Sequence, residues 1–528
     1  MRFVVLVGAG LIVAAVFASQ PPRRDWLRGV NVVWGVSGGQ GGIDYQGKAK
    51  VLVQRMKEAG VNITRIGISW ADIERERGHY HWAETDRLVN FLKAQGFDLL
   101  ACFCTTPPWA SAVGRSVVEL FSKRKCAHLL GVLPPAHDYW QDYERYCKAV
   151  AQHFKGRVWL YEFWNEPDGM GMPLPVYDSS GEAVDIRWGG DPELYAKLLR
   201  ITYRGLKSGD PHCLVAIGGL DGRPRLDFIE GVYRAGGGRY FDAVCLHPYP
   251  FGTRELAWGW VDAVRDVMVR HGDASKPIWI TEYGWNATGG DGISEDEQAQ
   301  LVAESILAMK QRPFIQMATY HTLNDWRTNE ADPASIIRMG LCDYDGNPKP
   351  AFSAFRSALD QPATVNQLRN PGFEREGSTP GVAESWQNTD GQAHPDWYAI
   401  DTRVRHGGRA SQRITFGHGA RPDLTVWQMT PAGSVYGGRT YAASVWCKAE
   451  GVRDNWGGLR LAVRFFAADG TMTQEFRAPL DPSGTTGWHK VSVTADAPKS
   501  SIRAQVVLYL HAESGTVWYD DAEFRLVR

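Results

Sequence analysis

The sequence predicts an α/β fold, a closed (β/α)8 TIM barrel, followed by an all-β domain of the jelly-roll sandwich type. Up to about residue 360, short apolar runs alternate with amphipathic stretches of helical period, which is the pattern of βα units around a parallel sheet. Beyond that point the helical pattern stops. Short alternating strands separated by Gly, Pro and Asp replace it, as in β-sandwiches.

Eight apolar runs form the strands of the predicted barrel. They are residues 29–34, 63–68, 98–104, 158–163, 214–218, 243–247, 277–281 and 317–320. Helical patterns lie between them, for example over residues 48–58 and 138–154. Eight such units favour a closed barrel, whose functional side chains lie at the C-terminal ends of the strands. An open doubly wound sheet is the alternative, but no glycine-rich dinucleotide turn follows the first strand.

The chain divides into four expected parts. Residues 1–18 have a basic start, an apolar run and small residues before Ser19, as a cleaved secretory signal does. An uncleaved membrane anchor is the alternative, although the run is short for a span of about 20 residues. We expect the barrel over 26–360, a linker over 361–365 and the β-sandwich over 366–528. From the cleaved signal we expect a secreted or periplasmic protein that has no membrane contact after cleavage.

The composition of the chain limits the classes of partner that it is expected to bind. The net charge of −1 gives no support for binding nucleic acid or anionic membranes. The chain has 21 Trp, and flat apolar rings of this kind stack on sugars as well as filling cores. Among the eight cysteines, neither a CxxC pair nor a Cys/His cluster indicates a metal site. Cys126 and Cys147 flank a long excursion and are candidates for a disulfide bridge.

Two glutamates carry the functional prediction. Glu166, in Trp164-Asn165-Glu166-Pro167, and Glu282, in Thr281-Glu282-Tyr283, each follow an apolar run. A single glutamate at a strand end is usually a surface residue. Burying a charge between an apolar strand and aromatic residues costs folding free energy, however. A charged residue in such a place is therefore more typical of a functional site. Two carboxylates facing each other across a cleft are what glycoside hydrolysis requires, so the pair predicts a glycosidase acting on carbohydrate.

Other strand ends supply candidate supporting residues. Arg65 lies inside an apolar run and needs an anionic partner, unless it points outward to solvent. Asn165 is suited to a sugar 2-hydroxyl, and His247 to another sugar hydroxyl. Tyr249 is placed to hydrogen-bond a carboxylate nucleophile and keep it ionised. Trp109 follows two prolines and is a candidate stacking wall.

Residues 29–358 resemble a clan A glycoside hydrolase, closest to family 39 and its relatives. The matching segments are Trp70-Ala71-Asp72-Ile73-Glu74 with Gly78 and Trp82, Pro107-Pro108-Trp109-Ala110-Ser111, Trp164-Asn165-Glu166-Pro167, His247-Pro248-Tyr249, Thr281-Glu282-Tyr283-Gly284-Trp285 and Lys349-Pro350-Ala351-Phe352. The resemblance implies retention of anomeric configuration, with Glu166 as acid/base and Glu282 as nucleophile. It also implies supporting roles for Arg65, Asn165 and Tyr249.

One segment departs from the family. Family 39 β-xylosidases tend to carry a tryptophan just after strand eight, where this chain has His321. Trp326 follows a few residues later, and Trp285 ends the strand-seven motif, so all three are candidate substrate contacts. The change disfavours xyloside specificity. It favours the family's polysaccharide-cleaving relatives, including those that act on bacterial exopolysaccharides.

The C-terminal part resembles carbohydrate-binding modules of the family 4/9/22 group at its opening (368–374) and its ending (517–524). The ends of such a fold meet, so Glu374 and Asp521 are candidates to share a structural Ca²⁺. The alternative is that these acids cap strands and bind nothing. Glycan binding by this part is left open. Its candidate platforms are Trp386, Trp397, Trp427, Trp456 and Trp488, although strand aromatics are more often core.

The prediction is therefore a secreted retaining glycoside hydrolase that acts by double displacement. Ionised Glu282 attacks the sugar, and Glu166 acts first as acid and then as base. We expect no cofactor and no catalytic metal. A transglycosidase uses the same two glutamates, and a non-catalytic glycan-binding protein is the third reading. The sequence predicts neither the sugar and linkage, nor exo or endo action, nor an oligomeric state.

Overall fold

The computed structural model describes residues 26–33, 43–111, 134–169, 176–177, 183–184, 190–222, 225–249, 257–287, 293–327, 336–361, 366–389, 391–417, 424–430, 433–453, 458–478 and 484–527. The expected signal segment, nearly all of the linker, Cys126 and Trp456 lie outside these residues. So do most of 113–135 and 170–190, two excursions that follow barrel strands. Within the described residues, no helix has the length and apolar character needed to cross a membrane.

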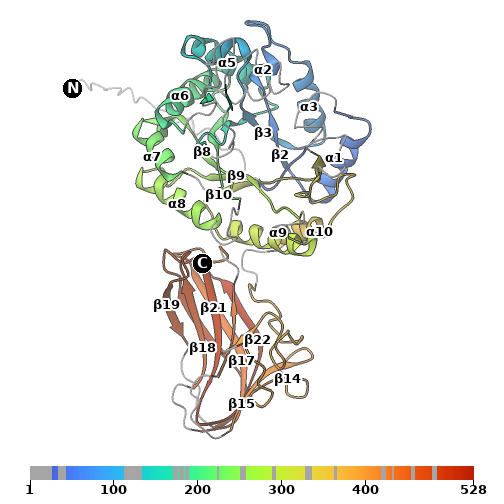
Figure 1. Cartoon of the computed structure of the whole chain (residues 1–528), viewed down its shortest axis with the longest axis vertical. Helices are drawn as coiled ribbons and strands as arrows, with labels where there is room; N and C mark the ends of the chain where they lie inside the picture. Colours follow the sequence, from blue (N-terminus) through green and yellow to red (C-terminus); the bar gives the residue numbers. More distant parts are fainter. Residues whose placement is uncertain are drawn as a thin grey trace, which may run out of the picture.

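Eight parallel strands close into a barrel, as predicted, in the order β1-β10-β9-β8-β7-β4-β3-β2 (Figure 1). They are β1 Trp26–Asn31, β2 Ile63–Gly67, β3 Asp98–Phe103, β4 Leu160–Asn165, β7 Leu214–Leu220, β8 Ala243–Leu246, β9 Ile278–Tyr283 and β10 Ile315–Tyr320. Every predicted strand is present, within a few residues at each end. The chain leaves the C-terminal ends of these strands at one rim, which brings the predicted site residues together.

Helices surround the barrel and cover the outer faces of its strands (Figure 1). They are α1 Lys48–Glu58, α2 Trp70–Ile73, α3 Ala83–Ala94, α5 Trp140–His153, α6 Pro192–Gly209, α7 Leu226–Arg234, α8 Ala257–Arg270, α9 Glu295–Lys310 and α10 Pro350–Asp360, with 3₁₀ turns at Pro108–Ala110, His137–Tyr139 and Gly237–Tyr240. Two two-stranded sheets pair β5 Val176–Tyr177 with β6 Ala183–Val184, and β11 Trp326–Arg327 with β12 Ile336–Ile337. Helix α1 shows the pattern: it buries Ala49, Leu52, Val53 and Met56 at helical spacing.

The barrel interior is packed with apolar side chains away from the rim. Every strand contributes to this cluster, which consists of Trp26, Ile63, Leu100, Leu160, Ala216, Ala243, Cys245, Trp279 and Met317. Bulky and small residues fill the space together, as in other barrels of this type. Three charged side chains, Arg65, Glu162 and Glu282, follow the cluster residues on their strands and therefore lie nearer the C-terminal rim.

The C-terminal part is a sandwich of two five-stranded antiparallel sheets, in the orders β13-β16-β21-β18-β19 and β14-β15-β22-β17-β20. The strands are β13 Gln387–Asn388, β14 Tyr398–Asp401, β15 Ser411–Phe416, β16 Leu424–Met429, β17 Thr440–Arg453, β18 Gly458–Phe466, β19 Met472–Arg477, β20 Gly484–Asp496, β21 Arg503–His511 and β22 Ser514–Leu526. Alternate residues of each long strand enter one apolar core, for example Tyr441, Ala443, Val445 and Cys447 of β17. The predicted β-sandwich is confirmed.

The sandwich lies against the outer helices of the barrel, beside α8 and α9 (Figure 1). The fully buried Arg312, which follows α9, is the centre of this contact. It makes two hydrogen bonds to Asp262 of α8, at 2.9 and 2.7 Å, and a third, at 2.8 Å, to the carbonyl of Gly433 in the sandwich. Tyr441 donates a 2.9 Å hydrogen bond to Gln311 at the same junction. A buried cation therefore joins the two parts.

The suggested bridge between Cys126 and Cys147 stays a prediction, because Cys126 lies outside the described residues. Cys147 itself is buried on α5, where it packs in the core of the barrel domain. Cys102, Cys213 and Cys245 are buried free thiols, as expected for small core residues. The spacing of Cys126 and Cys147 around a long excursion could not show that helical packing turns Cys147 inward.

Candidate active site

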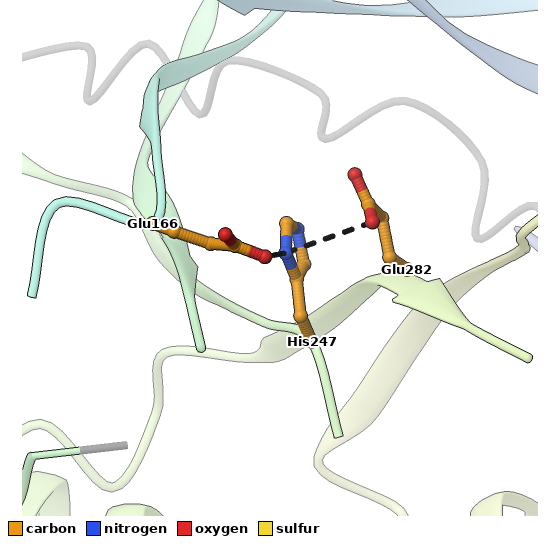
Figure 2. Close-up of side chains that lie close together, drawn as sticks. All are labelled: Glu166, His247 and Glu282. Carbon is orange, nitrogen blue, oxygen red and sulfur yellow. Dashed lines mark hydrogen bonds and ion pairs between the residues drawn. The ribbon is translucent and has the colours of Figure 1, made fainter. Parts of the chain in front are cut away.

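Glu166 and Glu282 face each other at the C-terminal rim of the barrel. Glu166 directly follows β4, and Glu282 is the last but one residue of β9. One oxygen of each carboxylate and a nitrogen of His247 all lie within 4.8 Å of one another. Figure 2 shows the imidazole of His247 between the two carboxylates. Both glutamates keep a small exposed fraction, 21% and 13%, so solvent and substrate reach them.

Tight backbone turns position Glu166. Trp164 (φ 76°) and Glu166 (φ 47°) both have left-handed backbone conformations, which L side chains seldom adopt. The amide of Glu166 donates to the carbonyl of Gly219 on the neighbouring strand β7, at 2.9 Å. Only glycine fits at 219, because a Cβ there would lie 2.1 Å from Nε2 of His247. The local strain and the glycine together set where the carboxylate of Glu166 lies.

Glu282 is held as an anion. Arg65 of β2 donates to its Oε1 at 2.6 Å, and the hydroxyl of Tyr249 donates to its Oε2 at 2.8 Å. Burial opposes ionisation of Glu282, but the rings of His247 and His321 and the guanidinium of Arg65 outweigh it. The pKa of Glu282 therefore lies well below its ordinary value. Such a carboxylate is suited to act as a nucleophile at neutral pH.

Arg65 is not a surface residue: it lies at the bottom of the site with acidic partners on two strands. Besides Glu282, it donates to Glu162 of β4 at 2.6 Å and to the side-chain oxygen of Asn165 at 2.9 Å. Glu162 is fully buried and also accepts hydrogen bonds from the amide of Gly219, at 2.9 Å, and the hydroxyl of Thr281, at 2.8 Å. Arg65 therefore fixes the two strands that carry Glu166 and Glu282.

His247 is fully buried beneath the two glutamates. Its Nδ1 lies 3.0 Å from Oε1 of Glu166 and 3.8 Å from Oε2 of Glu282. Its Nε2 lies 3.1 Å from the hydroxyl of Thr281. Both ring nitrogens thus face protein atoms, so the ring supports the carboxylates. The sequence suggested that His247 contacts a sugar hydroxyl directly. In this structure both ring nitrogens are directed to protein atoms instead.

His321, Trp326 and Asn31 lie on the Glu282 side of the site. The ring of His321 is 5.3 Å from that of Trp326 and 6.5 Å from that of Tyr249, edge to face in both cases. The amide of Asn31, at the end of β1, is 3.4 Å from Nδ1 of His321. Burial lowers the pKa of His321 below its ordinary value. The pair His321 and Trp326 thus continues the floor of the site beyond Tyr249.

Two candidate substrate tryptophans are turned toward other partners. The indole of Trp109 donates to the backbone carbonyl of Glu74 at 2.9 Å and packs edge to face on Trp70. The indole of Trp285 donates to Ser305 of α9 at 3.2 Å. Both are half-buried in contact with the barrel core. Their hydrogen bonds position loops at the rim, and a sugar contact by either ring stays a prediction.

Carboxylates lie close together at the barrel rim and in the sandwich. Among the described residues, one group of three side chains offers ligand atoms close enough for a shared ion, namely Glu166, His247 and Glu282. In the sandwich, Asp521 accepts a 2.7 Å hydrogen bond from His406, and Glu374 accepts one from the amide of Arg409. Both acids therefore face the turn 406–409. Two carboxylates on one turn are of the type that Ca²⁺ prefers, so that site stays a prediction.

Glu162 and Thr281 were missed by the sequence reasoning. Glu162 had a visible signal, because it is a charged residue inside an apolar strand, as Arg65 is. Thr281 had none, since a threonine in a strand is ordinary. Their pairing crosses from β4 to β9, which are separated in the barrel by β7 and β8.

Two family models match segments of the barrel. Residues 46–169 match the family model described as β-galactosidase (Glyco_hydro_42), and residues 193–355 match the model of the glycosyl hydrolase catalytic core. Both models describe glycoside hydrolases, so the expected resemblance of the barrel to this class of enzyme is confirmed. No curated protein matches the sequence.

Solved structures of similar shape were found as well. A glucosidase from Croceicoccus marinus is 14% identical, with 92% of this chain and 96% of that chain covered and a TM-score of 0.47. A GH39 β-xylosidase from Caulobacter crescentus is 14% identical (93% and 97% covered, TM-score 0.48). A GH39 enzyme from Xanthomonas axonopodis pv. citri is 15% identical (93% and 95% covered, TM-score 0.48).

Proposed function

We propose that this protein is a retaining glycoside hydrolase whose acid/base is Glu166 and whose nucleophile is Glu282. One observation carries the proposal: two carboxylates from different strands lie within 4.8 Å, and only Glu282 is tied to a cation and a phenol. The different surroundings give the two carboxyl groups different roles, as acid and nucleophile require. The matches to glycoside hydrolase models support the same reaction class.

The spacing supports retention. Retaining enzymes hold their carboxyl groups about 5–5.5 Å apart, whereas inverting enzymes need about 6.5–9.5 Å to admit a water molecule between them. Oxygens within 4.8 Å of each other fit the shorter of these two ranges. The carboxylate of Glu282 therefore attacks the anomeric carbon directly, and Glu166 gives a proton to the leaving oxygen. Water then attacks the glycosyl-enzyme and returns a proton to Glu166.

Asn165 is proposed to bind the sugar next to the bond that breaks. Its side-chain oxygen accepts from Arg65, so the amide group is turned with its N–H donors away from that cation. An N–H donor beside Glu166 is suited to a sugar hydroxyl, and such a contact strengthens in the transition state.

The test follows hydrolysis of a panel of glycans and aryl glycosides by wild type, Glu166→Ala and Glu282→Ala, with anomeric products read by NMR. We expect retained configuration, loss of activity in both variants, and rescue of Glu282→Ala by azide to give an inverted glycosyl azide. Glu58, a half-buried glutamate that ends α1 and pairs with Arg55, supplies the matched control Glu58→Ala, which is expected to keep full activity.

Other outcomes decide against the proposal. Inverted product from wild type, or full activity of either active-site variant, contradicts the assigned roles. Glycosides elongated in the presence of acceptor sugar, without net hydrolysis, would make the protein a transglycosidase. Glycan binding without turnover across the panel would leave a binding protein.

Three further expectations complete the proposal. Export by the segment 1–18 places the enzyme outside the cytoplasm, where polysaccharides are available as substrates. The β-sandwich is proposed as an accessory domain that binds glycan. Half-buried Trp397, Trp427 and Trp488 are its candidate platforms, whereas Trp386 is only 5% exposed and belongs to the core. No cofactor is required by the two-carboxylate reaction.

A further inference from the structure

A chain of hydrogen bonds beneath the site has a direction that the residues themselves dictate. Glu162 accepts from Arg65, from the amide of Gly219 and from the hydroxyl of Thr281. The hydroxyl of Thr281 has one hydrogen, and that hydrogen is directed to Glu162. The contact between Thr281 and Nε2 of His247, at 3.1 Å, therefore requires the ring to donate. Nε2 of His247 carries a proton whatever the charge of the ring.

The donation from Nε2 of His247 to Thr281 determines how Nδ1 of the same ring can interact with Glu166. With Nε2 protonated, a neutral ring has its lone pair on Nδ1, and Nδ1 is 3.0 Å from Oε1 of Glu166. Two arrangements fit that contact. Either the carboxyl of Glu166 donates to a neutral ring, or a charged ring donates to the carboxylate. Both contain one proton between the same two atoms.

The surrounding charges favour keeping that proton. His247 is faced by Glu162 and Glu166 from β4, by Glu282 from β9, by Asp221 after β7, by Arg65 from β2, by Tyr249 on its own segment and by His321 after β10. Acidic groups outnumber the one permanent cation. Burial disfavours a charged His247, but Glu282 and the hydrogen bond to Glu166 outweigh it and raise the pKa of His247 above its ordinary value.

We propose that His247 and Glu166 share a single catalytic proton, and that Thr281 and Glu162 fix the ring in the tautomer that allows this. The inference rests on the proposed glycosidase function and deepens it. In the first step the C–O bond to the leaving group breaks, Glu282 bonds to the anomeric carbon, and the shared proton moves to the leaving oxygen. A carboxylate at Glu166 and a neutral ring are left.

The charge of Glu282 then adjusts the pair for the second step. Once Glu282 is an ester, its negative charge no longer raises the pKa of the neighbouring pair, so the pair stays deprotonated after the first step and is available as the general base. Water attacks the anomeric carbon, the bond to Glu282 breaks, and the proton from water returns to the pair. His247 and Thr281 are positioning residues in this scheme, since they act through Glu166.

The test compares His247→Gln, Thr281→Val and Thr281→Ser with wild type, and uses the exposed His212→Gln as the matched control. Two aryl glycosides are used, one whose leaving group needs protonation and one whose leaving group does not. For the first substrate we expect kcat/KM of His247→Gln to fall by about 10²-fold. The alkaline limb of its pH profile should move to lower pH by about one unit or more. For the second substrate, kcat/KM of His247→Gln should fall much less.

Thr281→Val should shift the same limb in the same direction, and Thr281→Ser, which keeps the hydroxyl, should restore it. Histidine-selective ¹⁵N NMR gives a readout independent of turnover: the His247 signal should show Nε2 protonated throughout and Nδ1 titrating. Unchanged pH limbs in both His247→Gln and Thr281→Val, or an Nδ1-protonated neutral ring, would overturn the inference. Failure of wild type to hydrolyse any glycoside would instead reject the proposed function.

Discussion

The hydroxyl of Tyr249 donates a 2.8 Å hydrogen bond to Oε2 of Glu282, while Arg65 binds the other oxygen of the same carboxylate. Burial raises the pKa of Tyr249 far above its ordinary value, and the charge of Glu282 adds to the rise. The phenol therefore stays protonated, and Glu282 always receives its hydrogen bond. Each partner holds the other in the protonation state that nucleophilic attack needs.

Tyr249→Phe is expected to move the acidic limb of kcat/KM to higher pH. The pKa of Glu282 is depressed in the folded protein, so removing one donor raises it toward its ordinary value. A hydrogen bond to a charged group contributes about 1.5–3 kcal/mol, which corresponds to about one to two pH units. The measurement is the pH profile of kcat/KM. An acidic limb at the wild-type pH would show that Tyr249 does not stabilise the anion.

The same substitution has a consequence for folding. A depressed carboxyl pKa stabilises the fold at pH values above the unfolded pKa, about 4.3 for Glu, and this stabilisation fades as pH falls toward the folded pKa. Tyr249→Phe should therefore lower the free energy of unfolding at pH 7 more than at pH 3. Urea titrations at both pH values check this sign.

Most of the fold was predictable from local pattern. The eight barrel strands are apolar because helices cover one face and the packed interior covers the other, so each run stands out from its flanks. The positions of Glu166 and Glu282 followed from where two runs end. Even so, β9 extends to Tyr283, so Glu282 is a strand residue whose side chain points inward by alternation.

The connections beneath the site were not predictable. Contacts such as Thr281 to Glu162 and His247 to Glu166 join residues of different strands, and no local period encodes them. The orientation of Trp109 also depends on a distant residue, because its indole bonds the carbonyl of Glu74. Residue type at a strand end thus indicated the chemistry, whereas the direction of each side chain depended on tertiary packing.

Gly219→Ala is expected to abolish most activity while leaving the barrel folded. A Cβ at 219 would lie 2.1 Å from Nε2 of His247, so the ring must move away from Thr281 and Glu166. A misplacement of about 1 Å in an active site can cost about 10²-fold in rate. Gly67→Ala is the matched control, since Gly67 also lies at the C-terminal end of a barrel strand but a Cβ there meets no atom within 4 Å. Circular dichroism and kcat for both variants make the comparison, and equal activity would contradict it.

Arg312→Ala is expected to destabilise the junction between barrel and sandwich. Arg312 is fully buried, and its loss leaves Asp262 and the carbonyl of Gly433 without their cation. Removing one partner of a buried ion pair typically costs about 3–5 kcal/mol. Arg270→Ala, which breaks an exposed pair with Glu230, is the control and should cost about 1 kcal/mol at most. Denaturant unfolding of both variants measures the difference, and equal effects would show that the junction does not stabilise the chain.

Ca²⁺ is expected to stabilise the sandwich through Glu374 and Asp521. Both carboxylates press on the glycine pair 407–408: a Cβ on Gly407 would lie 2.7 Å from Asp521, and one on Gly408 would overlap Glu374. Asp521 accepts from His406 through Oδ2 and Glu374 accepts from the amide of Arg409 through Oε2, and each carboxylate has a second oxygen of the type that Ca²⁺ prefers. Millimolar Ca²⁺ should therefore raise Tm, and EDTA should lower it. Glu374→Gln should lose this response, whereas Glu384→Gln, an acid that pairs with Arg375 instead, should keep it. If Ca²⁺ does not change the Tm of the intact chain, the calcium site is rejected. Glu374 and Asp521 then serve only to hydrogen-bond the turn 406–409.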